Sequence, residues 1–372
     1  MPNSVKIRKD TSPLDSLCSP RMYELNANIS ALQFEVMKLI PARYIIEKGI
    51  EDNLIRKSTT IVESSSGTFA IALAIVCAHY GLKLKLVTGP VAPIVLWRLE
   101  ALGAEVDIIM STGGEGGIQQ DRMNHLKRIM ADSNDFFWTQ QHANPMNPFA
   151  YEQLISSRLQ EFAHIDYLVC STGTGGSITG ISRKLREVRP DLKVVGVDHN
   201  LSCLFGPTSG DVSRLCHDNY HPMLGMGSDV VHPNLDHSVC DQVHWMPVNE
   251  MIDAAHELHN QYGVFIGPTG ASTYKVAKHL LESNPGKNVL CIFCDHGVRY
   301  VDTIYDPEWL ASYGSDLDVD RACQPKQVFS SEAVAGEWVF QDWGRRTYKE
   351  VLGYDCLPRT ARLSDTLLAA QM

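Results

Sequence analysis

The chain has 372 residues, a length typical of two domains. Hydrophobic residues make up 44% of it and charged residues 20%, which indicates a globular protein with a large core. The formal net charge of −10 argues against an extended nucleic-acid-binding surface. The 10 cysteines show no disulfide-like pattern of spacings, so we expect reduced thiols and a cytoplasmic protein.

The N-terminal sequence MPNSVKIRKD continues into polar residues rather than into the apolar run of a secretory signal. The most apolar stretch is FAIALAIVCA, residues 69–78. It is too short to cross a bilayer, which takes about 20 residues, and it predicts a buried helix instead. We therefore expect no membrane partner.

Short apolar runs alternate with longer helical patterns along the chain. In order, the predicted elements are strand TTIVES (59–64), helix TFAIALAIVCAHYG, strand LKLKLVTG (82–89), helix APIVLWRLEALGA closed by Gly103, and strand EVDIIM (105–110). They continue with strand YLVCSTG (167–173), helix ITGISRKLREVRP, and strands KVVGVD (193–198) and NVLCIFCD (288–295). This alternation predicts an α/β fold with parallel sheets.

The strongest local signal for chemistry is STGTGGSITG, residues 171–180, which follows a strand and opens a helix. It contains four glycines, which let the backbone approach a ligand closely: Gly173, Gly175, Gly176 and Gly180. Free N–H groups and the positive end of the helix suit a phosphate, and Thr174 and Ser177 add hydroxyl groups. The loop fits neither GxGxxG nor the P-loop pattern, and the alternative is an ordinary tight turn.

A second strand–turn–helix segment, SSSGTFA, spans residues 64–70. Its small hydroxyl residues and Gly67 stand where helix N–H groups are free, a place suited to a carboxylate. The alternative is that a serine simply caps the helix.

Two lysines are candidate chemical groups. Lys38 lies between apolar neighbours in VMKLIPARYIIEKGI (36–50), and Lys6 lies in SVKIR (4–8). A poorly solvated lysine favours its neutral amine, which can form a Schiff base with an aldehyde. The alternative for Lys38 is a surface lysine whose alkyl stem covers apolar neighbours.

Taken together, the lysine, the SSG turn and the glycine–threonine loop resemble the cysteine synthase and cystathionine β-synthase family of fold-type-II pyridoxal-phosphate enzymes. The distance from Lys38 to the SSG turn matches the distance between the lysine and this turn in the family, whereas Lys6 lies too far upstream. The resemblance covers roughly residues 10–312. Within the family, PARYIIEKGI and FCDHGVRYVDTIYDPEWL are most similar to members that join an amino acid's amine to O-phosphoserine.

The resemblance implies two doubly wound sheet domains, as in the β subunit of tryptophan synthase, with the cofactor in the cleft between them. Residues 38–150 would form a smaller, mobile domain that carries Lys38 and the SSSGT loop. Residues 1–37 and 151–312 would form the larger domain with the phosphate loop, and 313–372 a C-terminal extension without assigned chemistry. A homodimer is also implied.

The resemblance also implies roles for individual residues. Lys38 would be the catalytic base and the anchor of pyridoxal 5'-phosphate. The other cofactor-binding residues would be Thr68, Gly173, Thr174, Gly175, Gly176, Ser177 and Thr269, the last facing the pyridine nitrogen. The substrate would contact Ser65, Ser66, Gly67, Thr68 and Gln141, with Gly225 of LGMGSD (224–229) at the entrance. The bulky Phe69 is expected to reshape the pocket for the substrate carboxylate.

The implied reaction is β-replacement on an activated L-serine, O-phosphoserine or O-acetylserine, through an aminoacrylate. An amino acid's amine is the preferred nucleophile and gives a C–N bond. Two alternatives stay open: a cysteine synthase that uses sulfide, and a weak or inactive binding protein that keeps the fold. The substrates are small amino acids in each enzymatic case.

Three further patterns are interpreted as structural. The histidines of HELH (256–259) are three positions apart, which does not fit the HExxH metal motif, so we expect no metal site. CIFC (291–294) lies in a strand pattern and predicts buried thiols. STGGEGG (111–117) predicts a mobile surface loop.

Overall fold

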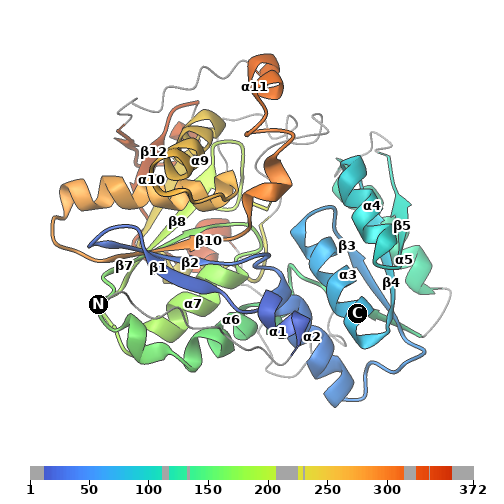
Figure 1. Ribbon diagram of the computed structural model, residues 1–372. Coiled ribbons are helices and arrows are strands. Elements are labelled where there is room, and N and C mark those ends of the chain that lie inside the picture. The colour runs from blue at the N-terminus through green and yellow to red at the C-terminus, as the bar shows by residue number, and fades with distance from the viewer. Residues whose placement is uncertain are drawn as a thin grey trace, which may run out of the picture.

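The computed structural model describes residues 12–110, 117–131, 135–206, 225–228, 231–313, 324–334 and 336–353. Lys6 and nearly all of STGGEGG lie outside these residues. Figure 1 shows two β-sheets, each covered by helices, that lie side by side. The α/β fold with parallel sheets that the sequence predicts is confirmed.

The smaller sheet has four parallel strands in the order β5-β4-β3-β6. Its strands are β3 (Thr60–Ser64), β4 (Lys83–Thr88), β5 (Ala104–Ile108) and β6 (Phe136–Trp138). The helices that connect them are α3 (Thr68–Tyr80), α4 (Pro93–Ala101) and α5 (Gly117–Ala131). The elements predicted between residues 59 and 110 are confirmed to within a few residues at each end.

The larger sheet has eight strands in the order β1-β2-β10-β7-β8-β9-β12-β11. The central strands β2, β10, β7, β8 and β9 run parallel, and antiparallel β1 and β12 flank them. The strands are β1 (Arg21–Glu24), β2 (Ile29–Gln33), β7 (Tyr167–Ser171), β8 (Lys193–His199), β9 (Gln242–Met246), β10 (Val289–Phe293), β11 (Lys326–Gln327) and β12 (Val339–Asp342).

Helices cover both faces of the larger sheet. Figure 1 shows α9 and α10 on one face and α6 and α7 on the other. The remaining helices are α1 (Pro13–Leu17), α2 (Leu39–Glu51), α6 (Met146–Ser156), α7 (Gly176–Leu185), α9 (Val248–Tyr262), α10 (Pro268–Ser283), α11 (Pro307–Tyr313) and α12 (Tyr348–Leu352). Short 3-10 turns are η1 (Leu159–Phe162), η2 (His237–Val239), η3 (Gly297–Tyr300) and η4 (Ser331–Ala333).

One hydrophobic cluster joins the two sheets. It contains Ile61 and Leu84 of the smaller sheet, Ile45 and Ile46 of α2, and Ile178 of α7, all buried. The apolar core therefore continues from one sheet through α2 to the other. The predicted domain boundaries and the mobility of residues 38–150 stay predictions.

The carboxyl ends of the parallel strands direct several loops into one cleft. In open parallel sheets, ligands bind at these ends because connecting loops converge there. In the larger sheet, Lys38 follows β2, the glycine-rich loop follows β7 and Cys294 follows β10. In the smaller sheet, the SSSGT loop follows β3 and Gln141 follows β6. Five strand ends in two sheets thus direct residues into one cleft.

Within residues 324–334 and 336–353, strands β11 and β12 belong to the larger sheet. Strand β12 pairs with β9, placing Val339 opposite Trp245. Trp343, directly after β12, is 2% exposed, and its ring lies 5.3 Å from that of Phe205. The described part of the C-terminal extension therefore protects a sheet edge and fills the core.

None of the helices that the structure describes is long and apolar enough to span a membrane. In the same residues, no group of three or more histidine, cysteine or acidic side chains could hold a metal ion.

We predict that Trp343→Ala lowers the free energy of unfolding by about 3–4 kcal/mol, because it opens a cavity under β12. Urea unfolding followed by tryptophan fluorescence measures the change. Phe329→Ala is the matched control, since Phe329 is 85% exposed and its loss should change stability by less than about 0.5 kcal/mol. Equal stability of both variants would show that the C-terminal segment does not belong to the folded core.

Candidate active site

Lys38 lies at the start of α2, and its backbone neighbours are fixed on the larger sheet. The Met37 N–H donates to the carbonyl of Cys294 at 2.8 Å, and the Tyr151 hydroxyl donates to the Met37 carbonyl at 3.2 Å. The Lys38 Nζ atom donates a hydrogen bond to Thr174 Oγ1 at 3.0 Å. The lysine predicted from the sequence therefore reaches the glycine-rich loop.

The protonation of Lys38 is shifted toward the neutral amine. Burial in the cleft lowers the pKa of Lys38 to about 8, and only the nearby Cys294 thiol opposes the shift. Because a lysine amine reacts with a carbonyl only when it is neutral, this shift prepares it as a nucleophile and a base.

The glycine-rich loop runs against neighbouring backbone, with no room for side chains. A Cβ atom on Gly173 would lie 2.4 Å from the carbonyl oxygen of Gly225, and one on Gly175 would lie 2.3 Å from the Leu235 Cα. Gly175 also has a φ of 81°, a left-handed conformation that favours glycine. The close packing fixes the path of the loop and requires glycine.

The N-terminus of α7 has free N–H donors. Gly175 is its N-cap residue, and no side chain among the described residues caps the helix. Uncapped N–H groups and the helix dipole form a binding site for a phosphate group. The Thr174 hydroxyl lies beside them and contacts both Lys38 and Asn147 Nδ2, the latter at 3.3 Å. These features fit the phosphate of pyridoxal phosphate next to a lysine that can bind its aldehyde.

A narrow cavity of about 20 Å³ lies between the lysine and the start of α10. Its lining includes Lys38, Thr174, Ser177, Thr269 and Cys294. Thr269 is buried near the N-terminus of α10, at the place predicted to face the pyridine nitrogen. A hydroxyl there is a weaker partner for that nitrogen than a carboxylate would be.

Cys294 is a cavity residue that the sequence analysis interpreted only as a buried thiol. Its Sγ atom lies 3.1 Å from Ser171 Oγ, and burial raises its pKa to about 11, which keeps the thiol protonated. Cys291, the other cysteine of the CIFC motif, is fully buried in β10. The alternation of the strand buries one thiol and carries the other to the strand end at the cleft.

The SSSGT loop forms the opposite wall of the cleft. Gly67 is the N-cap of α3, and none of the described side chains caps this helix. The alternative role of its serines as helix caps is therefore wrong. Arg122 of α5 donates from Nη1 to Ser66 Oγ at 3.3 Å, which brings a positive charge to the loop. Phe69 is 1% exposed and packs in the main hydrophobic cluster, and it also borders the cleft.

A polar cavity of about 210 Å³ lies over Lys38. The predicted substrate residues Ser65, Ser66, Gly67, Thr68, Gln141 and Gly225 all line it. It also includes three side chains that the sequence analysis did not assign to the site: Arg122, His142 and His232. The structure thus brings the predicted residues together, and their individual roles stay predictions.

A buried carboxylate positions one wall of this cavity. Glu63, in β3, accepts hydrogen bonds from Thr139 Oγ1 at 2.6 Å, Trp138 Nε1 at 3.2 Å and the Gln141 N–H at 3.0 Å. Burial nevertheless raises the pKa of Glu63, so the desolvation is larger than these contacts offset. Glu63 therefore holds the turn that carries Gln141 and His142, at a cost in stability.

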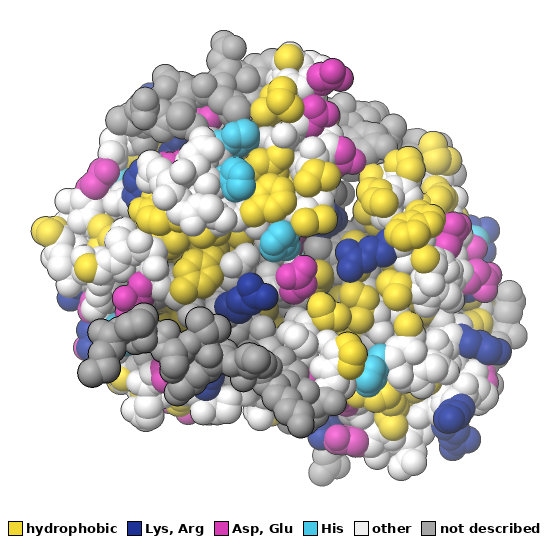
Figure 2. Space-filling model, in the orientation of Figure 1, with side chains coloured by type: hydrophobic (Ala, Val, Ile, Leu, Met, Phe, Trp, Pro, Cys, Tyr) yellow, Lys and Arg dark blue, Asp and Glu magenta, His cyan; other side chains and the backbone are white. Residues whose placement is uncertain are grey.

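A larger cavity of about 470 Å³ opens beside the site. It shares Ser66, Thr68 and Asp295 with the two smaller cavities, and most of its wall is apolar. Figure 2 shows hydrophobic side chains around a histidine and side chains of both charges in the middle of one face. The cavity itself is lined by residues of these kinds, including Ile94, His296 and Arg299. It offers room for a second substrate next to the reacting centre.

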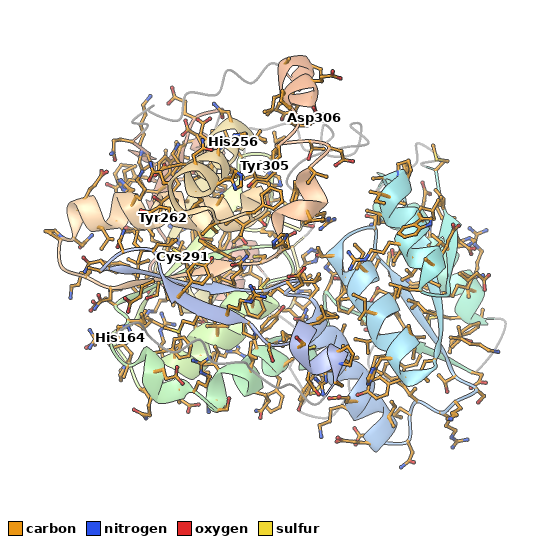
Figure 3. The ribbon with its side chains drawn as sticks, in the orientation of Figure 1. His164, His256, Tyr262, Cys291, Tyr305 and Asp306 are labelled. Atoms are coloured by element: carbon orange, nitrogen blue, oxygen red, sulfur yellow. The ribbon has the colours of Figure 1, made fainter. Side chains whose placement is uncertain are left out.

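The HELH histidines lie on α9, away from these cavities. Figure 3 shows His256 beside Tyr305, and their ring centroids are 5.3 Å apart. The ring Nε2 of His256 contacts the Ile304 carbonyl at 2.6 Å, so its role is structural.

Comparisons with known proteins identify the family. Residues 34–295 match the family model described as pyridoxal-phosphate dependent enzyme. The chain is 32% identical over 278 residues to N-(2-amino-2-carboxyethyl)-L-glutamate synthase from Cupriavidus metallidurans, covering 73% of this chain and 79% of that protein. The chain belongs to the pyridoxal-phosphate dependent enzyme family.

Solved structures with the same fold are similar over most of the chain. A hydrogen sulfide-producing enzyme from Fusobacterium nucleatum has a TM-score of 0.68 and 25% identity, covering 78% of this chain and 100% of that one. An O-acetylserine-dependent cystathionine β-synthase from Helicobacter pylori has a TM-score of 0.70 and 24% identity, with 81% and 100% covered. The predicted fold type II is thus confirmed.

The protein is a pyridoxal-phosphate-dependent enzyme of the β-replacement class, and its cofactor is pyridoxal 5'-phosphate. When bound, the cofactor supplies the electron sink that stabilises negative charge at the Cα of an amino acid. As predicted from the sequence, the residues that would hold it are Lys38 at the aldehyde, the 173–177 backbone at the phosphate and Thr269 at the ring nitrogen.

We predict that the rate at which the cofactor-free protein binds pyridoxal phosphate covalently rises about tenfold per pH unit up to pH 8 and then levels off. The reason is that Lys38, with a pKa of about 8, is mostly neutral above that pH. Stopped-flow absorbance measures the rate. Lys38→Arg is the control and should bind no cofactor covalently. A rate that keeps rising toward pH 10.5, the ordinary lysine value, would contradict the assignment.

Proposed function

We propose that the enzyme replaces the leaving group of an activated L-serine with the amine of a second amino acid, forming a C–N bond. The observation that carries the proposal is the buried Lys38 amine, with its pKa lowered to about 8, 3.0 Å from the hydroxyl of the loop that fits the cofactor phosphate. The nucleophile is inferred from the relative at 32% identity, whose name describes a glutamate nitrogen that carries a 2-amino-2-carboxyethyl group.

In the proposed reaction the residues act in sequence. The substrate carboxylate binds the Ser65–Thr68 loop, where α3 offers free N–H groups, and Gln141 lies opposite. The Lys38 amine removes the Cα proton, and the leaving group departs from Cβ with its electron pair. The lone pair of the nucleophile then forms the new bond at Cβ, and Lys38 returns the proton to Cα.

Arg122 favours O-phosphoserine over O-acetylserine. Its guanidinium lines the catalytic cavity and already contacts Ser66. A phosphate dianion gains more from a guanidinium than a neutral ester does, both in binding and as the bond to Cβ breaks. We therefore propose O-phosphoserine as the preferred first substrate.

The cavities of about 210 and 470 Å³ do not favour the alternative of a cysteine synthase that uses sulfide. Sulfide is a single heavy atom, whereas the cavity of about 470 Å³ beside the site can accept a whole amino acid. The space for a second organic substrate supports the amine.

We further propose that the enzyme acts in specialised amino-acid metabolism in the cytoplasm, as a homodimer. The seven cysteines of the described part of the chain all carry free thiols, which suits a reducing compartment. The homodimer rests on the resemblance to the family alone.

The test follows each half of the reaction. We expect O-phosphoserine to change the absorbance spectrum of the loaded enzyme within the mixing time of a stopped-flow experiment. Subsequent addition of L-glutamate or L-aspartate should restore the original spectrum and yield a product with a new C–N bond, identified by mass spectrometry. Arg122→Met should reduce kcat/KM for O-phosphoserine about tenfold or more, and change it less for O-acetylserine.

Two outcomes would overturn the proposal. Cysteine from added sulfide as the only product would make the protein a cysteine synthase. A protein that binds no cofactor, or that binds it without any response to either serine ester, would support the non-catalytic alternative.

A further inference from the structure

Two histidines, the half-buried His142 and the buried His232, stack on each other in the wall of the catalytic cavity. His142 follows β6 in the turn that Glu63 holds, and His232 comes from the segment before η2. Their ring centroids are 4.1 Å apart with planes inclined by 31°, and both rings line the cavity over Lys38. The backbone fixes this pair, since the Asn234 N–H donates to the His142 carbonyl at 3.3 Å.

One ring nitrogen of this pair is unused. The Nδ1 atom of His142 is buried and has no hydrogen-bond partner among the described residues. A buried polar atom without a partner costs free energy, which a ligand in the cavity can offset by donating a hydrogen bond. The groups that donate in this way include the ammonium or amine of an amino acid.

The surroundings keep both rings neutral. Burial lowers the pKa of His142 well below its usual value, and the facing His232, Lys38 and Arg122 lower it further. Burial and Lys38 lower the pKa of His232 to about 3. The buried Glu63 carboxylate lies behind the turn, bound to the Gln141 N–H. A neutral imidazole offers a lone pair and does not repel a cationic amine.

The proposed reaction needs a group that accepts a proton from the ammonium ion of the nucleophile, and Lys38 cannot be that group. An amino acid is an ammonium ion in water and must lose one proton before its nitrogen can attack Cβ. At that stage Lys38 already holds the Cα proton, which it must return to Cα. A second acceptor is therefore required for a C–N bond, whereas sulfide near neutral pH is already largely an anion and requires none.

We propose that His142, backed by His232, is the catalytic residue that binds the amine of the nucleophile and accepts its proton. This inference rests on the proposed function. It names the residue that lets the enzyme use an amine rather than sulfide as the nucleophile. His142 Nδ1 accepts an N–H of the ammonium ion and takes its proton. The freed lone pair then forms the bond to Cβ, and the proton leaves His142 for solvent through the open side of the cavity.

The cavity makes the ammonium ion of the nucleophile a stronger acid than it is in water. The ion experiences the same burial and the same positive charges that lower the pKa of His142. Because both pKa values fall together, the transfer is drawn forward by the formation of the bond to Cβ, which consumes the free amine.

The test compares the reactions of L-glutamate and of sulfide in the same variant enzyme. In His142→Phe, the ring volume and the stacking on His232 remain, but the nitrogen is lost. We expect the spectral change with O-phosphoserine to keep its rate within about threefold. The return of the spectrum with L-glutamate at pH 7 should slow on the order of 10²-fold, while the return with sulfide stays unchanged.

Three further measurements exclude a merely structural role. Raising the pH, which supplies free amine, should restore the glutamate reaction of His142→Phe. Added imidazole should accelerate His142→Gly and leave the parent unaffected. In the cofactor-free protein, ¹⁵N chemical shifts of labelled histidines should show a neutral His142 ring from pH 5 to pH 9. His164→Phe, at an exposed histidine labelled in Figure 3, is the control for the substitution itself.

The outcomes distinguish the two proposals. If neither serine ester changes the spectrum of the parent, the proposed function fails. If the change occurs but His142→Phe reacts with glutamate as fast as the parent, only the role of His142 is overturned. Equal slowing with glutamate and sulfide, or a His142 ring protonated at pH 7, would also contradict it.

Discussion

The contact between the Lys38 amine and the Thr174 hydroxyl is the interaction on which the site depends. It joins the segment after β2 to the loop after β7, two neighbours of β10 in the larger sheet. The loop can reach the lysine only because its glycines allow backbone to pack on backbone, as Gly173 does against Gly225. A side chain at that position would push the loop away from the amine, and the cofactor's aldehyde and phosphate could no longer be held together.

Burial is the common cause behind the chemistry of the cleft. It lowers the pKa of Lys38 and of His142, and it raises the pKa of Cys294, so all three groups shift toward their neutral forms. Neutral amines and imidazoles are bases, and a neutral thiol does not compete as a nucleophile. The structure sustains this environment through the Glu63 hydrogen bonds and the continuous apolar core that joins the two sheets.

Local patterns were sufficient to predict the α/β class and half of the strands that the structure describes. The segments predicted as strands formed strands, as TTIVES did in β3. Strand β12, between β9 and the edge strand β11, was missed because its four residues carry no clear alternation in the polar C-terminal sequence. The lysine and loops of the site were found by their spacing. Arg122 and His232 were not, because each reaches the cleft from a segment whose position depends on tertiary packing.

The most direct test of this account is to locate the covalent bond between the protein and its cofactor. The loaded enzyme is reduced with borohydride and digested, and the modified peptide is identified by mass spectrometry. We predict that a single pyridoxyl group lies on Lys38, in the peptide that contains VMKLIPAR. A pyridoxyl group on Lys6 or on any other lysine, with Lys38 unmodified, would contradict the central claim.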